Sequence, residues 1–222
     1  MLHEWLVLIG LTIGALLPIA NPFSAAPVFV AITQRMGRSR RTQQARMAAV
    51  YMAFLLLGAF IAGALILKFF GISMPALRIA GGLVIARVGF SMLNPEPSHE
   101  LQPEDQDAAL DMNDIAFTPI AMPLLSGPGS IAVTISLATS VDKTINHIPV
   151  AMGIVIVSFL SWLVLRSSMK VVDLLGSTGV NVLTRLMGLI LVCIGIQFVA
   201  DGFIDLITDK EIVARIISVY SG

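Results

Sequence analysis

Two proline-rich phrases recur in an otherwise apolar chain, PIANP at residues 18–22 and PIAMP at residues 119–123. Each is followed at the same distance by a further proline, Pro27 in the first case and Pro128 in the second. Proline removes a backbone hydrogen-bond donor and clashes with the preceding helical turn. Helices that are broken at matching places in two halves of a membrane protein are typical of the substrate sites of transporters.

The composition indicates that most of this chain lies in a membrane. Hydrophobic residues make up 56% of the 222 residues, and charged residues only 13%, where soluble domains carry roughly 25%. The formal net charge is zero, so nothing points to an electrostatic partner such as nucleic acid. Cys193 is the only cysteine, which excludes an intramolecular disulfide and a cysteine-based metal cage.

Six apolar segments are candidates for membrane crossing. They cover residues 5–32, 48–67, 77–93, 115–139, 148–165 and 183–207. The first has no basic region before it, so we expect a retained span and no cleaved signal peptide. The first and the fourth exceed the ~20 residues that a crossing needs, and they contain the prolines. We therefore predict that both are broken, either crossing fully or re-entering the same leaflet.

Basic residues between the spans predict the orientation, because loops rich in lysine and arginine stay in the cytoplasm. The strongest cluster lies between the first two spans and consists of Arg35, Arg38, Arg40, Arg41 and Arg46. The connection between the fifth and sixth spans carries Arg166, Lys170 and Arg185. These loops are predicted to be cytoplasmic, which with six crossings puts both termini in the periplasm.

The chain divides into two similar halves. Residues 1–94 form a first three-span repeat and residues 115–222 a second, with an acidic, proline-containing linker at 95–114. The linker is most simply a solvated connection, and the alternative is a metal-binding or regulatory arm. In the third span of each half a leucine and two glycines share one spacing, Leu77, Gly82 and Gly89 against Leu183, Gly188 and Gly195. An odd number of spans per half predicts an all-α membrane protein with inverted-topology repeats.

The two broken segments supply the candidate binding residues. They are Asn21, Pro22 and Ser24 in the first segment and Ser126, Gly127, Pro128, Gly129 and Ser130 in the second. A helix that restarts at such a break offers free amide groups and a positive dipole end to a carboxylate. Carbonyl ends suit a cation or an ammonium group. The alternative is that the prolines only kink helices and the glycines only allow close packing.

Arg87 is a further candidate for the binding site, because an ionisable group inside a span is functional by default. It could pair with Asp201, bind a substrate carboxylate, or point into a cavity. The three histidines have no partner at helical spacing, so we expect no zinc site. No nucleotide-binding loop is present, and we expect no cofactor.

Taken together, these motifs resemble the MarC family of six-span proteins of the bacterial inner membrane. The resemblance rests on PIANP with Pro27, on LRIAGG at residues 77–82, on PIAMP with the GPG at residues 127–129, and on RLMG at residues 185–188 with Gln197 and Phe198. The family includes SnatA-type transporters of small neutral amino acids such as glycine and alanine. The resemblance therefore implies transport of such amino acids across the inner membrane. Arg87 and Asp201 depart from the family, where many members carry uncharged residues.

Three classes of function are open at this point. A secondary transporter with alternating access accounts for the doubled broken helices, and its driving force would be an Na⁺ or H⁺ gradient or exchange of the solute itself. A membrane scaffold or assembly protein leaves those breaks unexplained. An intramembrane enzyme would need a nucleophile with a base, or paired carboxylates, facing each other in the bilayer. No such set is evident, so we do not expect an enzyme. Membrane lipids should contact the arginine cluster.

Overall fold

The computed structural model describes residues 2–94, 115–139 and 146–208, and every element in these ranges is a helix. In chain order they are α1 (Leu2–Ala20), α2 (Pro22–Thr33), α3 (Arg38–Phe70), α4 (Met74–Leu93), the π-helix η2 (Ala116–Leu125), α6 (Pro128–Thr139), α7 (His147–Arg166) and α8 (Ser168–Thr208). The predicted all-α class is confirmed. The acidic linker at 95–114 lies outside the described residues.

Most of the helices are built to cross a bilayer. Five are long and apolar enough, namely α1, α3, α4, α7 and the part of α8 at Thr178–Thr208. The pair η2 and α6 is a sixth candidate, bent by 64° where the two helices meet. Large apolar side chains such as Phe54, Leu83 and Phe159 are exposed on the outside. An apolar exterior of this kind suits hydrocarbon as the solvent.

Both proline-containing segments are interrupted, as predicted. α1 ends at Ala20 and α2 begins at Pro22, and between them Asn21 has the left-handed backbone conformation φ 34°, ψ 66°. In the second segment Thr118 and Met122 have extended backbone inside η2, and Ser126 and Gly127 separate η2 from α6. Met122 holds the place in PIAMP that Asn21 holds in PIANP. The second segment is therefore broken at more places than the first.

Two helices extend well beyond their apolar segments. α3 begins at Arg38, so most of the predicted arginine loop is instead its first turns. α8 begins at Ser168, directly after the end of α7, and turns sharply at Gly176, where φ is 63° and ψ 178°. Hydropathy marks where a chain enters hydrocarbon. The helix itself continues through polar residues of good helix propensity, such as the arginines and glutamines that open α3.

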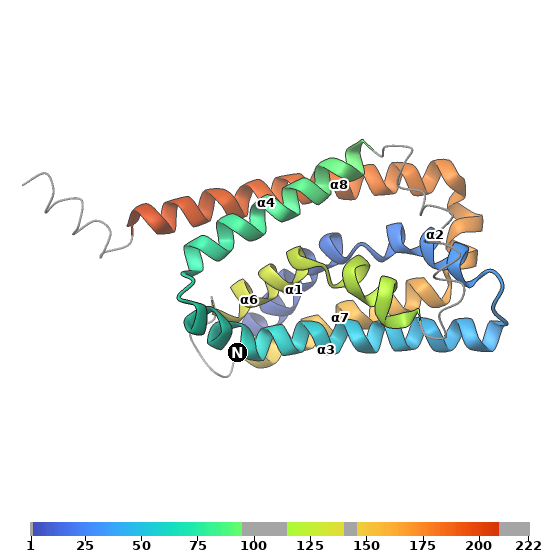
Figure 1. Ribbon diagram of the computed structural model, residues 1–222, viewed down its shortest axis with the longest axis horizontal. Coiled ribbons are helices and arrows are strands. Elements are labelled where there is room, and N and C mark those ends of the chain that lie inside the picture. The colour runs from blue at the N-terminus through green and yellow to red at the C-terminus, as the bar shows by residue number, and fades with distance from the viewer. Residues whose placement is uncertain (1, 95–114, 140–145, 209–222) are drawn as a thin grey trace, which may run out of the picture.

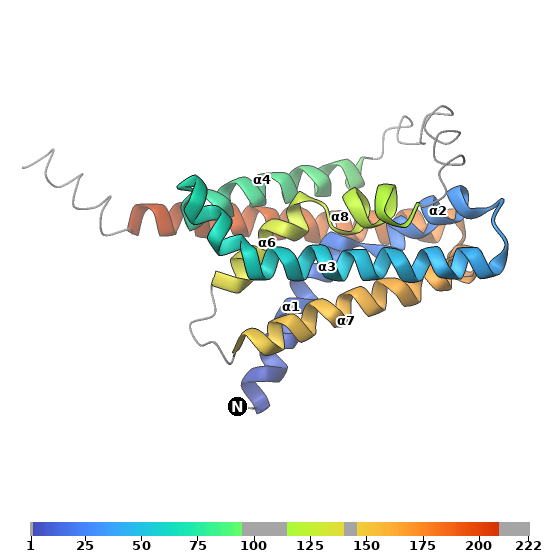
Figure 2. The same cartoon turned by 60° about the horizontal axis from the view of Figure 1, so that its bottom comes forward.

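The broken segments lie between two pairs of unbroken helices. Figure 1 shows α4 and α8 along one side, α3 and α7 along the other, and α1, α2, η2 and α6 between them. Figure 2 shows from a second direction that α1 crosses α3 and that its N-terminal half extends past the start of α7. The contacts agree, since α6 packs on both α3 and α4 while α2 packs on both α7 and α8. The interrupted backbone is thus covered by protein on two sides.

Glycines allow α4 and α8 to approach closely. A β-carbon at Gly82 would lie 2.5 Å from the carbonyl oxygen of Gly195, and one at Gly89 would lie 2.7 Å from that of Gly188. Residue numbers rise along α4 as they fall along α8, so the two helices are antiparallel. Small residues drive close helix packing in membranes, where lipid is as apolar as leucine.

Basic side chains from three helices gather at one end of the bundle. The turn between α2 and α3 and the junction of α7 with α8 lie at one end, and the N-terminus and the end of α8 lie at the other (Figure 1). Arg38 and Arg41 of α3 line one cavity together with Arg166 of α7 and Lys170 of α8. We call this the basic end. The two basic regions of the sequence thus lie on the same side.

Substitution of Gly195 by alanine is expected to lower thermal stability. The added β-carbon would lie 2.5 Å from the Ala86 nitrogen and 2.6 Å from the Gly82 oxygen, and overpacking of this kind costs about 1–3 kcal/mol. Gly58→Ala on α3 is the matched control, because nothing lies within 4 Å of its new β-carbon. Thermal unfolding in detergent should give a lower midpoint for Gly195→Ala alone. Equal midpoints would contradict the close approach of α4 and α8.

Candidate functional site

Asn21 organises the first break. Its side-chain oxygen accepts a hydrogen bond from the Ser24 amide at 3.3 Å, which caps the start of α2. Pro22 occupies the first turn, where a missing N–H costs nothing. Asparagine is one of few residues other than glycine that enter the left-handed region without large strain. The PIANP phrase therefore ends one helix and restarts the next within a single residue.

The side chain of Asn21 also belongs to a partly buried polar chain that joins three helices. Its amide nitrogen donates to the Ser24 hydroxyl at 2.7 Å and lies 4.0 Å from the Met92 sulfur of α4. The Ser24 hydroxyl lies 3.0 Å from the hydroxyl of Thr184 on α8. We call Asn21, Ser24 and Thr184 the α2 clasp, because they fasten the start of α2 to α8. The sequence analysis named Asn21 and Ser24 as candidate binding residues and did not name Thr184.

The second break exposes polar groups inside the protein. Ser126 is fully buried, and its hydroxyl has no hydrogen-bond partner. Its amide donates to the carbonyl of Ala121 at 2.8 Å, and the carbonyl of Gly127 accepts from Ile131 at 3.2 Å. Ser130 is 1% exposed, and its hydroxyl donates to Leu125 at 3.3 Å. A buried hydroxyl without a partner is rare in proteins and calls for an explanation.

The two breaks meet in the middle layer. α6 begins at Pro128, and a β-carbon on the following Gly129 would lie 2.9 Å from Ile85 of α4 and 3.5 Å from Ile19 of α1. Ile19 lies two residues before Asn21. The start of α6 therefore packs against the end of α1, close to where α2 begins. Both helix starts carry first-turn N–H groups and a positive dipole end in this region.

Arg87 lies apart from the other predicted site residues. It is exposed on α4, while the buried face of that helix consists of Gly81, Gly82, Ile85, Ala86 and Gly89. The structure therefore does not bring Arg87 to the two breaks. Asp201 of α8, considered as its partner, instead accepts a hydrogen bond from Gln197 at 2.7 Å.

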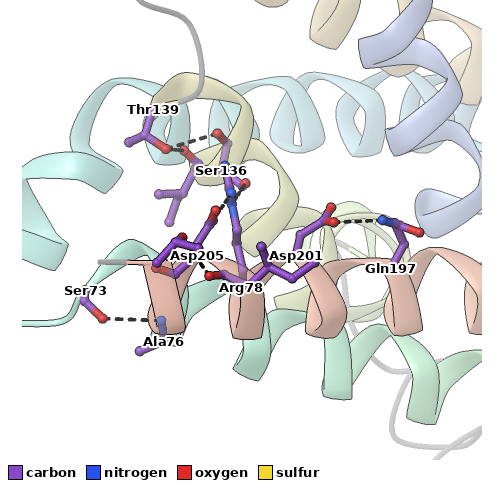
Figure 3. Close-up of polar contacts among 11 residues, drawn as sticks. Ser73, Ala76, Arg78, Ser136, Thr139, Gln197, Asp201 and Asp205 are labelled. Carbon is purple, nitrogen blue, oxygen red and sulfur yellow. Dashed lines mark hydrogen bonds and ion pairs between the residues drawn. The ribbon is translucent and has the colours of Figure 1, made fainter. Parts of the chain in front are cut away.

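A second polar cluster fastens α6 to α4 and α8. Arg78 of α4 forms an ion pair with Asp205 of α8 and donates from Nε to the Ser136 hydroxyl of α6 at 3.3 Å. Figure 3 shows Arg78 reaching between Asp205 and Ser136, with Asp201 farther along α8. We call Arg78, Ser136 and Asp205 the α6 clasp. Sequence reasoning did not identify this cluster, because its contacts depend on how α4, α6 and α8 are rotated about their axes.

The described part of the chain holds no group of three or more histidine, cysteine, aspartate or glutamate side chains that could bind a metal ion. The chemistry of the two breaks is instead that of hydroxyls, one carboxamide and backbone groups. Such an arrangement can bind a small polar molecule of no net charge.

Comparison with known proteins places the chain. The family description "MarC family integral membrane protein" matches residues 6–207, which include both breaks and both clasps. The chain belongs to the MarC family. The inner membrane protein MarC of Citrobacter koseri is 40% identical over 210 residues, covering 90% of this chain and 95% of the relative. Those of Escherichia coli strain SMS-3-5 and Shigella flexneri are 39% identical with the same coverage. No solved structure matches.

Membership in the MarC family confirms the resemblance that the proline and glycine motifs predicted. The relatives are named inner membrane proteins, and this chain has several helices long and apolar enough to cross a bilayer. It is therefore a multi-pass inner-membrane protein. The names of these MarC relatives say nothing of a substrate, so the use of the two breaks has to be argued from their chemistry.

Replacement of Asn21 should show that its backbone conformation matters as well as its side chain. Asn21→Ala loses the cap but keeps a β-carbon in the left-handed region, where its cost of about 1–2 kcal/mol is no longer offset by side-chain hydrogen bonds. Asn21→Gly loses only the side-chain bonds, so it should unfold at a higher temperature than Asn21→Ala.

The matched control is Ser73, which caps α4 through a bond from the Ala76 amide but has φ −76°. There the advantage of glycine over alanine should be smaller, because the backbone is already extended and only the general preference of N-caps for glycine applies. Thermal unfolding of all four variants in detergent measures this. A higher midpoint for Asn21→Ala than for Asn21→Gly would contradict the left-handed conformation.

The ion pair of the α6 clasp should be energetically coupled. Arg78→Gln and Asp205→Asn each remove one member of a partly exposed ion pair, so each should destabilise the protein modestly. The double variant leaves neither charge and should lose less than the sum of the two. A double-mutant cycle from unfolding in detergent measures the coupling. Strictly additive effects would show that the two side chains do not interact.

Proposed function

We propose that this MarC-family protein is a secondary transporter of small neutral amino acids, of the glycine and alanine type, that works by alternating access. The observation that carries the proposal is the meeting of two interrupted segments inside the bundle, where Gly129 packs on Ile19. Unwound backbone at membrane depth is tolerated only where protein or a cavity covers it. Two unwound segments at one place leave many backbone groups without helical hydrogen bonds. A binding site would use these groups, whereas a scaffold would not need them.

The packing supports an architecture of six crossings in two inverted three-span repeats. In this architecture η2, α6, α7 and α8 repeat α1, α2, α3 and α4. Contacts then occur in matching pairs: α1 packs on α7 as η2 packs on α3, and α2 packs on α8 as α6 packs on α4. The glycine contacts are also reciprocal, Gly82 with Gly195 and Gly89 with Gly188. A two-fold axis in the membrane plane relates such pairs.

The groups at the breaks match an amino-acid zwitterion. The carboxylate would lie at the start of α6, against the first-turn amides that follow Pro128 and the unpartnered hydroxyl of Ser126. The ammonium group would lie against the Asn21 and Ser24 oxygens and the carbonyls freed at the breaks. All of these protein groups are uncharged, so the site suits a ligand whose positive and negative charges cancel.

The close packing at the breaks favours a small substrate. Gly129 is in contact with two isoleucines, Ile19 and Ile85, and even a methyl group at Gly129 would overlap Ile85. A large substrate side chain would have to displace these residues. Glycine and alanine add little or nothing beyond the zwitterion itself. The resemblance to SnatA-type transporters supports the same substrate class.

The two clasps supply the gates that alternating access requires. The α2 clasp holds α2 on α8 through Ser24 and Thr184, and the α6 clasp holds α6 on α4 through Arg78 and Ser136. Both are formed in this structure. We infer that opening toward one side breaks one clasp and leaves the other closed.

Orientation and energy source complete the proposal. The basic end faces the cytoplasm by the positive-inside rule, which puts both termini in the periplasm. Transport is driven by an Na⁺ or H⁺ gradient or by exchange. Uptake into proteoliposomes under an imposed gradient of each ion separates these three possibilities.

Proteoliposomes that contain the purified protein should take up labelled glycine and alanine. Ser126→Ala should reduce uptake by about tenfold or more, since a hydrogen bond to a charged group contributes about 1.5–3 kcal/mol. The same change should leave thermal stability unchanged or raise it, because the hydroxyl is buried without a partner.

Ser161→Ala is the matched control. Ser161 is also fully buried, but its hydroxyl donates to Val157 in its own helix, so this variant should transport normally. Asn21→Asp, which keeps the capping oxygen but loses the amide donor, should also lower uptake. No uptake of either amino acid by the wild-type protein, with or without ion gradients, would reject the substrate class. Normal uptake by Ser126→Ala would reject the placement of the carboxylate.

A further inference from the structure

A cavity of about 680 Å³ at the basic end carries a strong excess of positive charge. It is lined by Arg38, Arg41, Thr42, Leu163, Arg166, Ser167, Met169, Lys170 and Asp173. Four cationic side chains thus face a single carboxylate. The cations come from the start of α3, the end of α7 and the start of α8. The tertiary fold therefore assembles this cavity, and no single stretch of the sequence does.

One side chain that lines this cavity has a polar atom without a partner. Arg41 donates from Nη2 to the carbonyl of Thr33 at 2.9 Å, but its Nε is buried and unpaired. Buried polar groups are normally hydrogen-bonded. An unpaired donor among four cations indicates a site for an oxygen-bearing anion.

An aromatic ring holds Arg166 in place. Its guanidinium lies 5.0 Å from the centre of the Trp162 ring, at a distance typical of a cation–π contact. Tryptophan prefers the boundary between hydrocarbon and headgroups. This contact places the cavity at the level of the lipid phosphates.

An apolar groove runs from this cavity toward the middle of the bundle. A second cavity, of about 330 Å³, lies between α3 and α7 and is lined by Arg46, Ala49, Val50, Ala53, Val155, Ser158, Phe159 and Trp162. On α3, residues 46, 49 and 53 line the second cavity and lie on the same helix face as Thr42, which lines the first. On α7 Val155, Phe159 and Trp162 lead to Arg166. Residues spaced by three and four lie on one face of a helix, so both cavities follow the same crevice.

We propose that this crevice is a binding site for one anionic phospholipid. The phosphate lies among Arg38, Arg41, Arg166 and Lys170, and an acyl chain lies in the groove between α3 and α7. A free phosphate would use the basic cavity but not the apolar groove that continues from it. Basic pockets between membrane helices on the cytoplasmic side recognise anionic headgroups. The proposal does not depend on what the protein transports.

Native mass spectrometry of the whole protein in detergent tests the site. The protein is titrated with phosphatidylglycerol, with phosphatidylcholine of the same acyl chains, and with inorganic phosphate. Phosphatidylglycerol should be retained preferentially, and Arg41→Gln/Arg166→Gln should weaken its binding by about tenfold or more. Arg35→Gln is the control for loss of charge, because Arg35 is exposed near the same end but does not line the cavity.

Two further variants guard against misfolding and test the groove. Arg38→Gln/Lys170→Gln removes two exposed cations of the cavity, so it should fold normally and still lose affinity. Ala53→Phe fills the groove and should weaken phosphatidylglycerol binding while leaving every cation in place.

Three outcomes would overturn the proposal. Equal retention of the two lipids would show that this is ordinary lipid contact. Binding of inorganic phosphate as tight as that of phosphatidylglycerol, unaffected by Ala53→Phe, would show a site for free anions. Unchanged phosphatidylglycerol binding by the well-folded Arg38→Gln/Lys170→Gln variant would place the lipid elsewhere.

Discussion

A peptide group without a hydrogen-bond partner costs several kcal/mol in hydrocarbon, and this chain contains two helices that break at membrane depth. The layered arrangement follows from that cost. The segments around Asn21 and Ser126 lie between α4 and α8 on one side and α3 and α7 on the other. Part of the cost is met locally, since Asn21 caps α2 and Ser126 donates to Ala121. The hydroxyl of Ser126 has no hydrogen-bond partner within the described structure, which is why we propose that a ligand binds it.

The walls around the broken segments depend on a different interaction. Helices in lipid gain nothing by burying leucine, so α4 and α8 associate through close backbone contact. Gly82 meets Gly195 and Gly89 meets Gly188, each at a separation that leaves no room for a β-carbon. A wall fixed by backbone contact is rigid, because the four glycines have no side chains that could repack. Rigid walls around interrupted helices concentrate movement in the helices that carry the breaks.

The sequence predicted those parts of the structure that depend on local chemistry. Proline weakens a helix by its local chemistry, so the breaks at PIANP and PIAMP could be predicted. Asn21 was singled out as a binding residue, and its role as the cap of α2 is seen only in the structure. The α6 clasp depends on the rotation of each helix, which hydropathy does not reveal. Arg87 attracted attention because it lies mid-span, yet it is only two residues from buried Ile85 and therefore on the opposite face of α4. Arg78 lies in the predicted span at 77–93, but the sequence does not reveal that its side chain reaches Ser136 of α6.

The two clasps use equivalent positions with different chemistry. Arg78 and Thr184 each follow the leucine that starts the shared leucine–glycine–glycine spacing, and each bonds the second half of a broken segment, α6 in one case and α2 in the other. The α6 clasp includes an ion pair, whereas the α2 clasp joins neutral groups only. Charge-assisted bonds are roughly twice as strong as neutral ones. The ion pair itself joins α4 to α8, and α6 is held by the bond from the charged Arg78 side chain to Ser136. The bond that must break to release α6 therefore has a charged donor, whereas release of α2 breaks a bond between two neutral hydroxyls.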